Sequence, residues 1–315
     1  MTRDVFLILN PGVMTTVQDR GRFGYRKYGI PVSGALDTFS FMASNRLVGN
    51  DDDTPVLELT FKGPEFEVLA DCVIALAGAQ MTLRVNGDDK PLWTSVQLAK
   101  GDVVRVGQAV RGLRGYLAVG GGICVDSVMG SASTFVPANI GGYKGRGLVA
   151  GDILQAHESD RSFRPVMIRP EYRPGLESRI TVRAVPGPQE DFFESDGDAL
   201  FSTEYICGPK SDRMGIRLQG PKMEFTDANR MTIISEPTLK GCVQTPPDGQ
   251  PIILLVEQTM GGYAKIATVI NPDLDLLAQL KPGDAVRFEK ITIENALRAH
   301  RLHKASVQAI NPSFV

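Results

Sequence analysis

The sequence predicts a mainly β protein of two domains with a few short helices, and three observations lead to this fold class. The chain has 315 residues, more than one hydrophobic core usually organises. Short apolar runs alternate with turn residues, and the 33 glycines and 20 prolines are typical of barrels or sandwiches. A third observation is an alternating pattern that occurs once in each half of the chain.

The repeated pattern lies in residues 57–68 and 214–225. Each segment alternates apolar and polar residues on both sides of a Gly-Pro pair, so one face of each strand is expected in a core. Aligning the two Gly-Pro pairs places Leu57 on Met214, Leu59 on Ile216, Phe61 on Leu218, Phe66 on Met223 and Val68 on Phe225. We therefore expect two related β domains with these matched positions buried.

A second recurring unit is a Gly-Asp pair before an apolar strand. It occurs at Gly101-Asp102, Gly151-Asp152 and Gly283-Asp284. Glycine supplies the turn geometry and the aspartate caps the backbone of the turn.

Helices are expected at three places. Asp37 can cap a helix that Gly49 ends, Pro272 can start one that Pro282 ends, and residues 294–304 form the third. Between the halves, residues 161–176 carry three Arg-Pro pairs and no periodic pattern. We predict an N-terminal domain over 1–165, a C-terminal domain over 176–291, and a C-terminal helix and tail over 292–315.

Composition excludes several classes of function. The net charge of −2, from 34 basic and 36 acidic residues, gives no attraction for nucleic acid or an anionic membrane. The first apolar run, residues 5–9, is too short for a signal peptide or a membrane span, so a cytoplasmic protein is expected. The four cysteines show no Cys-x-x-Cys spacing and are expected to be buried thiols.

Several catalytic motifs are absent from the sequence. There is no phosphate-binding Gly-x-x-x-x-Gly-Lys-Ser/Thr loop, no Gly-x-Ser-x-Gly elbow, no His-Glu-x-x-His, and no Ala-Met-Lys-Met segment for covalent biotin. His157, His300 and His303 lie outside every polar loop. A serine–histidine nucleophile and a metal site are therefore not expected.

Polar loops of the second half carry the candidate site. Arg213 can hold a carboxylate or phosphate while Asp212, after Ser211, accepts a proton, although a plain surface turn explains these residues equally well. Gly261-Gly262 can form a nest of amide N–H groups for an oxyanion, with Lys265 as an added cation. Spacing alone favours a tight hairpin at the glycine pair and a solvated lysine.

A rigid turn over residues 246–251 is the third polar loop. The amide side chains of Gln244 and Gln250 can form hydrogen bonds with polar groups of a ligand. The alternative is a simple β-turn without a binding role.

These loops resemble, in order, the allophanate hydrolase subunit 2 family. The family includes the C subunit of bacterial 5-oxoprolinase, the antagonist of a sporulation kinase inhibitor, and one half of the carboxyltransferase domain of urea carboxylase. The resemblance rests on residues 15–22, 31–37, 47–50, 185–189, 211–215, 246–251 and 261–265. It implies a cyclophilin-like β-barrel for each half. The chain departs from the family pattern before Gln258, where an Asp-Arg pair is replaced, and at Met260, where a hydroxyl is lost.

The resemblance implies a component of an ATP-dependent 5-oxoprolinase, a hydrolase that opens the 5-oxoproline lactam to glutamate. It would be active only with a partner similar to allophanate hydrolase subunit 1, the B subunit of 5-oxoprolinase, and the A subunit is a further candidate partner. ATP would lie on the partner or be shared with it. Catalysis is expected from Asp212, Arg213 and Asp37, and substrate binding from Ser211, Gln244, Gln258, Thr259, Gly261, Gly262, Tyr263, Lys265 and Arg20.

Two alternatives remain open from the sequence. One is carboxyl transfer in a biotin-dependent urea carboxylase or allophanate hydrolase system, in which the same pocket receives carboxybiotin. The other is a non-enzymatic antagonist of a kinase inhibitor.

Overall fold

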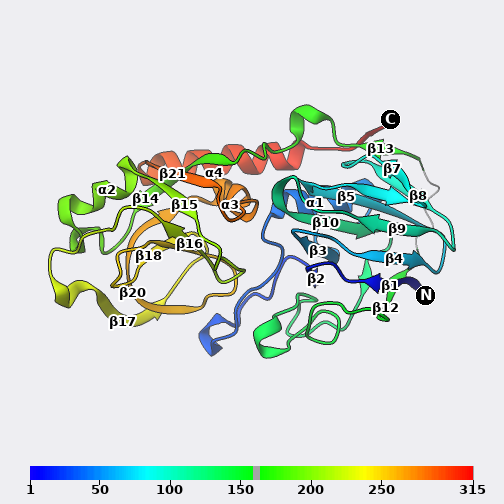
Figure 1. Cartoon of the computed structure of the whole chain (residues 1–315), viewed down its shortest axis with the longest axis horizontal. Helices are drawn as coiled ribbons and strands as arrows, with labels where there is room; N and C mark the ends of the chain where they lie inside the picture. The colour runs from blue at the N-terminus through cyan, green and yellow to red at the C-terminus, as the bar shows by residue number, and fades with distance from the viewer. Residues whose placement is uncertain (159–163, 315) are drawn as a thin grey trace. The chain divides into compact units, whose positions relative to one another are not determined.

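A computed structural model describes residues 1–158 and 164–314. The chain forms two compact units (Figure 1). Unit 1 comprises Met1–Phe23, Ser33–Leu176 and Ile310–Val315, and unit 2 comprises Gly24–Val32 and Glu177–Ala309. Both units are built mainly of strands, so the predicted mainly β fold class is confirmed.

Unit 1 is made of two large antiparallel sheets. The seven-stranded sheet has the order β11 (Ile123–Cys124), β12 (Ile153–His157), β1 (Thr2–Asn10), β4 (Glu65–Val68), β9 (Val103–Val106), β6 (Leu83–Val85) and β7 (Asp88–Lys90). The five-stranded sheet has the order β2 (Met14–Gln18), β3 (Val56–Thr60), β10 (Arg111–Val119), β5 (Cys72–Gln80) and β8 (Ser95–Leu98). A two-stranded sheet pairs β13 (Val166–Met167) with β22 (Ser313–Phe314).

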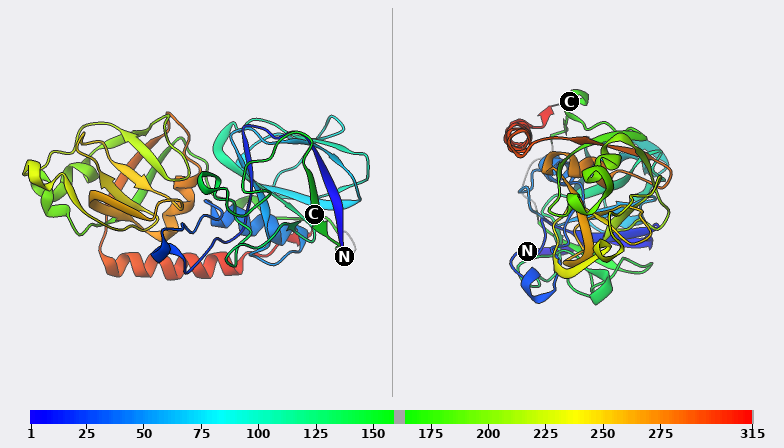
Figure 2. Two further views of the ribbon diagram at one scale, coloured as in Figure 1. Left: turned by 90° about the horizontal axis from the view of Figure 1, so that it is seen from below. Right: turned by 90° about the vertical axis from the view of Figure 1, so that its left-hand side faces the viewer.

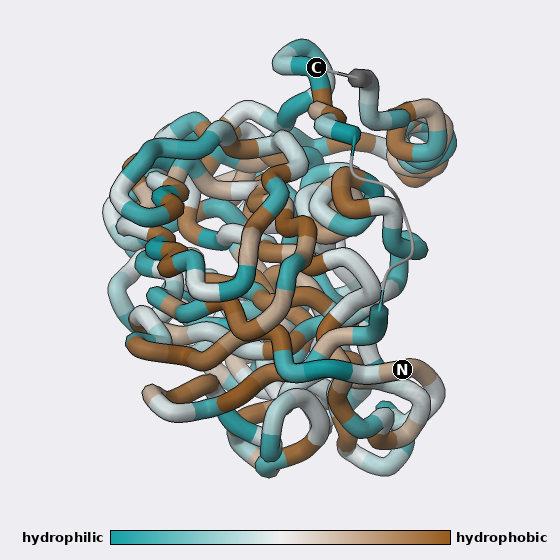
Figure 3. Tube along the Cα trace, turned by 90° about the vertical axis from the view of Figure 1, so that its right-hand side faces the viewer, coloured by the Kyte–Doolittle hydropathy of each residue, from teal (hydrophilic) through white to brown (hydrophobic). Residues whose placement is uncertain are grey.

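The main core of unit 1 draws on both large sheets, and Figure 3 shows apolar residues gathered along their strands. Phe6 and Phe66 of the first sheet pack with ring centroids 4.3 Å apart, in the same cluster as Leu76 and Leu117 of the second. A further apolar cluster joins helix α1 (Thr38–Val48) to β5 and β10. Strands β5 and β10 are therefore buried on both faces, which explains their nearly continuous apolar sequences.

Unit 2 is a closed barrel. Its seven strands follow the order β14 (Arg179–Pro186), β21 (Ala285–Lys290), β15 (Glu204–Cys207), β16 (Gly215–Gln219), β19 (Ile252–Leu254), β18 (Cys242–Thr245) and β20 (Met260–Val269). Pairing of β14 with β20 closes the ring, and β17 (Thr232–Pro237) is added along β20 (Figure 2). Closure removes the unpaired edges that an open sheet would expose.

The remaining helices are short, except for α4. The α-helices are α2 (Asp198–Ser202), α3 (Leu274–Ala278) and α4 (Ile293–Ala309). The 3₁₀ helices are η1 (Arg26–Tyr28), η2 (Val136–Ala138), η3 (Pro170–Tyr172), η4 (Glu190–Phe192), η5 (Glu194–Gly197), η6 (Ala228–Arg230) and η7 (Asn271–Asp273). Within the described ranges, no helix combines the length and apolar character that a membrane span requires.

The expected caps of α1 are confirmed. The Asp37 carboxylate accepts a hydrogen bond from Ser40 N at 2.9 Å, and Gly49 ends the helix with a left-handed φ of 74°. The helix expected from Pro272 is shorter than predicted, because η7 occupies its first turn and α3 ends at Ala278. The C-terminal helix is longer than residues 294–304.

All three Gly-Asp pairs form the expected turn. Each glycine has a φ near +90°, between 88° and 94°. Each aspartate accepts a hydrogen bond from the backbone N–H three residues earlier: Asp102 from Ala99 at 2.8 Å, Asp152 from Val149 at 2.8 Å and Asp284 from Lys281 at 3.0 Å. The turn then leads directly into β9, β12 and β21.

The internal repeat holds only in part. Leu59 and Ile216 lie buried in strands, and Phe66 and Met223 are buried as matched. The predicted burial is wrong for Phe61 and Met214, which are 37% and 42% exposed. Phe61 adopts a left-handed φ of 66° at a turn, and Met214 precedes its strand, so neither follows the alternation. Phe225 is half-buried and lies outside the named strands, in an isolated bridge to Phe193.

Candidate functional site

The candidate site is a pair of neighbouring cavities on the barrel of unit 2. One, of about 360 Å³, is lined by polar side chains from loops and strands, including Asp212, Gln258, Gln244 of β18 and Tyr263 of β20. The other, of about 330 Å³, includes Lys210 and Gln250. Both are lined by Arg217, Pro246, Asp248 and Ile252, so the cavities adjoin each other, and we call the pair the barrel groove.

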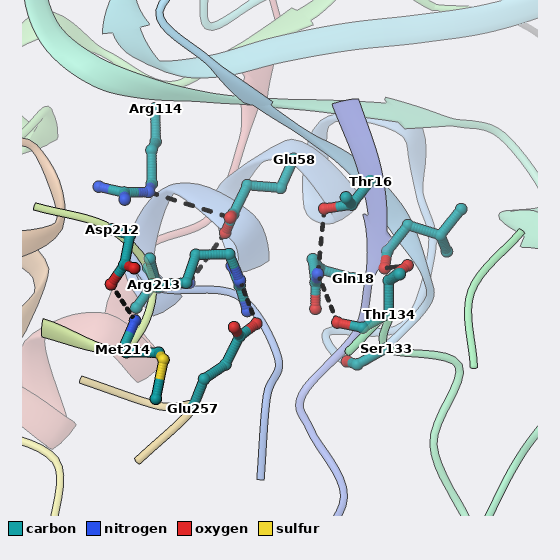
Figure 4. Close-up of polar contacts among 12 residues, drawn as sticks. Thr16, Gln18, Glu58, Arg114, Ser133, Thr134, Asp212, Arg213, Met214 and Glu257 are labelled. Atoms are coloured by element: carbon teal, nitrogen blue, oxygen red, sulfur yellow. Dashed lines mark hydrogen bonds and ion pairs between the residues drawn. The ribbon is translucent and has the colours of Figure 1, made fainter. Parts of the chain in front are cut away.

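Asp212 presents a carboxylate to the barrel groove. Its Oδ1 accepts hydrogen bonds from Met214 N at 2.8 Å and Gly215 N at 3.2 Å, which hold the side chain in a turn at the start of β16 (Figure 4). The side chain is exposed. No donor among the described residues reaches Oδ2, which is therefore available to a substrate proton.

Gln244 lies against the glycine pair that follows Met260. Its side chain is 3% exposed, and Nε2 donates to the carbonyl of Tyr263 at 3.3 Å. A Cβ at Gly261 would lie 2.3 Å from Nε2 of Gln244, so glycine at this position makes room for the amide. The pair lies inside β20, where Gly261 is opposite Glu236 of β17.

The sequence-based interpretations of Gly261-Gly262 are therefore both wrong. A hairpin is excluded because the residues lie within a strand of ten residues. A nest needs successive backbone conformations of opposite hand, and neither glycine has a positive φ. The pair leaves space for the amide of Gln244, next to a register irregularity between β17 and β20.

Arg213 is engaged by a carboxylate of the protein. Its Nε lies 2.6 Å from Glu257 Oε1, and the two side chains are only 12% and 6% exposed (Figure 4). A buried pair of this kind satisfies the guanidinium charge. The predicted role of Arg213 as the ligand of a substrate anion is not supported by this contact.

Lys265 is likewise paired. Its ammonium group bonds Glu236 Oε1, and Gln189 Nε2 donates to the same oxygen at 3.3 Å. The hydrogen bond from Lys265 lowers the pKa of Glu236. The lysine side chain is 7% exposed, so the expectation of a solvated lysine is wrong.

The other predicted residues are divided between the groove and the surrounding loops. Ser211 Oγ donates to the carbonyl of Gly208 at 2.8 Å and accepts from Arg217 N at 3.0 Å, so the hydroxyl stabilises its own turn. Gln258 lines the groove, while its Nε2 donates to the carbonyl of Met260 at 2.5 Å. The Thr259 carbonyl accepts from Thr238 N at 3.0 Å.

Asp37 and Arg20 belong to unit 1. Asp37 is 1% exposed, and its second oxygen accepts from Ser40 Oγ at 2.6 Å, so the structure gives it the role of a helix cap. Its backbone N–H donates to the hydroxyl of Tyr116, which in turn donates to Glu58 at 2.9 Å. Burial raises the pKa of Tyr116 well above its ordinary value. The Arg20 side chain is exposed.

The loop around Arg20 is organised by its neighbours. Asp19 accepts hydrogen bonds from Gly21 N, Ser131 Oγ, Ala132 N and Ser133 Oγ. Arg22 is fully buried and donates to the carbonyls of Val128 and Ser133, each at 2.9 Å. These two charged residues join residues 19–22 to residues 128–133, and desolvation lowers the pKa of Arg22.

Three charged groove residues were missed by the sequence reasoning, namely Lys210, Arg217 and Asp248. Arg217 is an outward-facing residue of β16 that lines both cavities, and no ion pair is found for it within the described ranges. Asp248 lies in the 246–251 turn and accepts from Gln250 N at 3.0 Å. The alternation of β16 was a usable signal for Arg217, because it places residue 217 on the face opposite the core.

Arg26 holds a wall of the groove from a distant part of the sequence. Its guanidinium donates to the carbonyl of Thr238 and, at 3.3 Å, to that of Gln258. This contact lies within unit 2, to which Gly24–Val32 belongs.

Taken together, the barrel groove combines a carboxylate that has a free oxygen with a buried amide, a tyrosine and an arginine. Asp212 can accept a proton, and Arg217 can bind an anion. Gln244 and Tyr263 can form hydrogen bonds with polar groups of a ligand. The groove is suited to a small polar molecule that carries a carboxylate.

Comparison with known proteins shows which proteins this chain is similar to. The chain is 38% identical over 301 residues to the C subunit of the 5-oxoprolinase of Escherichia coli, covering 93% of this chain and 94% of that protein. It is 31% identical to the urea amidolyase of Saccharomyces cerevisiae, covering 96% of this chain but only 17% of that protein. The crystal structure of Kluyveromyces lactis urea carboxylase matches with a TM-score of 0.91 at 29% identity, over 98% of this chain and 29% of that one. The model of the family described as "Carboxyltransferase domain, subdomain A and B" matches residues 28–290, and the chain belongs to this family.

Proposed function

We propose that this chain is a component of an ATP-dependent 5-oxoprolinase, which opens the 5-oxoproline lactam to glutamate together with a partner similar to allophanate hydrolase subunit 1. The observation that carries the proposal is the 38% identity to the C subunit of a bacterial 5-oxoprolinase, over 93% of this chain and 94% of that protein. A match that covers nearly all of both proteins supports a shared role better than a match to one segment of a long enzyme.

The barrel groove supplies the chemistry that this chain contributes. 5-Oxoproline is a small lactam with one carboxylate, so Arg217 binds the carboxylate and Gln244 contacts the lactam amide. Asp212 accepts a proton through its free Oδ2 from the water whose oxygen bonds to the lactam carbonyl carbon, and returns that proton to the ring nitrogen as the C–N bond breaks. Arg213 and Lys265 keep Glu257 and Glu236 in place.

The groove does not fit the triphosphate of ATP. Its described lining includes the cations Lys210 and Arg217 and the carboxylates Asp212 and Asp248, so the positive charge that a polyphosphate needs is offset. In this proposal ATP is therefore held mainly by the partner, which makes the active complex heteromeric.

Biotin-dependent carboxyl transfer is the second candidate. The family's carboxyltransferase description and the TM-score of 0.91 to urea carboxylase favour it. In that case the barrel groove would receive the carboxylated ring of biotin from another protein, with Gln244 and Asp212 facing its polar edge.

One experiment separates the two candidates. The chain is co-purified with its subunit 1-like partner, and ATP hydrolysis is measured with 5-oxoproline, and separately with urea plus a biotinylated carrier and biotin carboxylase. We expect turnover with 5-oxoproline alone. Turnover that requires the biotinylated carrier would contradict the 5-oxoprolinase proposal.

Residue roles are tested in the same assay. Asp212→Asn keeps an oxygen that can accept from Met214 and Gly215 but removes the base, so kcat should fall at least about 100-fold. Arg217→Gln should mainly raise KM for 5-oxoproline. Arg287→Gln is the matched control, since Arg287 is another exposed arginine on a barrel strand, paired with Glu204, and its loss should leave turnover unchanged. Full activity of Asp212→Asn would rule out its role as base.

A further inference from the structure

We propose that unit 1 carries a second binding site, separate from the barrel groove, for a small organic carboxylate with an apolar body. The site is a cavity of about 300 Å³ where the end of α1 meets β5 and β8. None of its described lining residues belongs to unit 2, and none has a part in the proposed lactam chemistry.

The cavity has an apolar floor and a basic rim. Leu47, Val48 and Val73 supply the floor. Arg3 and Arg164 supply the rim, together with Arg46. A carboxylate with a short hydrocarbon body matches this arrangement, because its charge meets the arginines while its body covers apolar surface.

The rim arginines differ in how their charges are satisfied. Arg46 forms a double contact with Asp52 at 2.7 and 2.8 Å and donates to the carbonyl of Ile310, so its charge is balanced within the protein. Arg3 donates to the carbonyl of Asp71 at 2.6 Å, which is a neutral group. Its Nε is buried and has no hydrogen-bond partner in the described part of the chain.

Neither Arg3 nor Arg164 has an ion-pair partner among the residues that the structure describes. Of the described residues that line the cavity, Asp71 alone carries a carboxylate, and its Oδ1 accepts from Lys100 N at 2.8 Å. Two cations against one carboxylate leave a net positive charge, which favours an anion. An arginine with a buried donor and no partner gains most from a ligand oxygen, since an unmade buried hydrogen bond is costly.

The thiol of Cys72 does not give this cavity a reactive nucleophile. Its thiol lines the cavity, and burial raises its pKa to about 12. The thiol therefore stays protonated at neutral pH and is a poor nucleophile. It contributes to the floor as a small apolar group.

The test uses hexanoate as the probe and hexanamide as its neutral counterpart. Binding of each to the full chain is measured by titration calorimetry at low salt. We expect hexanoate to bind at least 10-fold more tightly than hexanamide, because only the carboxylate pairs with Arg3 and Arg164. Equal binding of the two, or no binding of hexanoate at millimolar concentration, would overturn the proposal.

Variants assign the binding to this cavity. Arg3→Gln and Arg164→Gln should each weaken hexanoate binding about 10-fold, and Arg3→Lys should restore part of it. Arg111→Gln is the control, because Arg111 is an exposed arginine of unit 1 that does not line the cavity. If Arg111→Gln weakens binding as much as Arg3→Gln, the attraction is a general surface effect and the site is wrong. Because the comparison of hexanoate with hexanamide uses the unaltered chain, the test remains decisive if one variant unfolds.

Discussion

One contact changes the role that is assigned to Arg213. In the sequence, an arginine next to Asp212 in a polar loop is a natural ligand for a substrate anion. In the structure, Glu257 occupies that role at 2.6 Å, and both side chains are almost fully buried. Removing one member of such a pair leaves a buried charge without compensation, which costs more than the pair contributes.

Arg213→Ala should therefore lower stability and not only activity. We expect the free energy of unfolding to fall by roughly 3–5 kcal/mol, measured by urea denaturation. The double variant Arg213→Met with Glu257→Leu should recover much of that loss, because neither charge of this pair is left buried without the other. A single variant as stable as the wild type would contradict the assignment of Arg213 as a structural residue.

At the scale of the element, the alternation in β20 is interrupted by two glycines with different surroundings. The Cβ of an alanine at residue 261 would meet the amide of Gln244 at 2.3 Å, whereas the closest atoms at residue 262 are 3.2 Å away. The first position thus controls the shape of the barrel groove.

Gly261→Ala should displace Gln244 and raise KM for 5-oxoproline about 10-fold, with stability lowered by about 1–3 kcal/mol. Gly262→Ala is the matched control and should change stability by less than about 1 kcal/mol. The measurements are steady-state kinetics of the complex and urea denaturation. Equal effects of the two substitutions would show that the Gln244 contact does not shape the groove.

One of the Gly-Asp turns makes the stability of the protein depend on pH. Asp152 also forms a double contact with Arg146 at 2.7 and 2.8 Å, and this hydrogen bonding lowers the pKa of Asp152. A carboxyl whose pKa is lowered by folding stabilises the protein above its unfolded pKa of about 4. The stabilisation is lost as the pH falls through the lower, folded pKa.

Asp152→Asn should therefore cost about 1.5–3 kcal/mol at pH 7. The difference from the wild type should shrink below about pH 4, as the wild-type carboxyl becomes protonated. Asp102→Asn is the control, since Asp102 accepts from Ala99 N and Asn86 Nδ2, which are neutral donors. Its effect at pH 7 should be smaller, and a cost for Asp152→Asn that is unchanged from pH 7 to pH 3 would contradict the linkage.

On the scale of the whole molecule, local signals predicted the elements, and long-range contacts escaped prediction. The strand alternation, the cap at Asp37 and the three Gly-Asp turns depend on neighbouring residues, so the sequence displays them. The Arg213–Glu257 and Lys265–Glu236 pairs join residues on different strands or loops, and no spacing rule specifies such partners. The contact of Arg26 with Thr238 and Gln258 spans still more of the chain.

The proposed division of labour between this chain and its partner is also a property of the whole molecule. We expect the isolated chain to show no 5-oxoproline-dependent ATP hydrolysis, and the co-purified complex to show it. Addition of purified partner to purified chain should restore turnover in proportion to complex formed, measured by gel filtration. Full turnover by the isolated chain would refute the proposed dependence on the partner.

The division of the chain into units has a consequence for its synthesis. Unit 1 includes both Met1–Phe23 and Ile310–Val315, and β22 pairs with β13 only after residue 313 has been made. Unit 2 in turn includes Gly24–Val32, which leaves the ribosome long before the barrel does. Each unit is therefore interrupted along the chain by residues of the other, and unit 2 is fully translated before the last residues of unit 1. Unit 1 must wait, partly assembled, until the whole barrel has been translated, and a nascent chain stalled within the barrel should remain a substrate for chaperones.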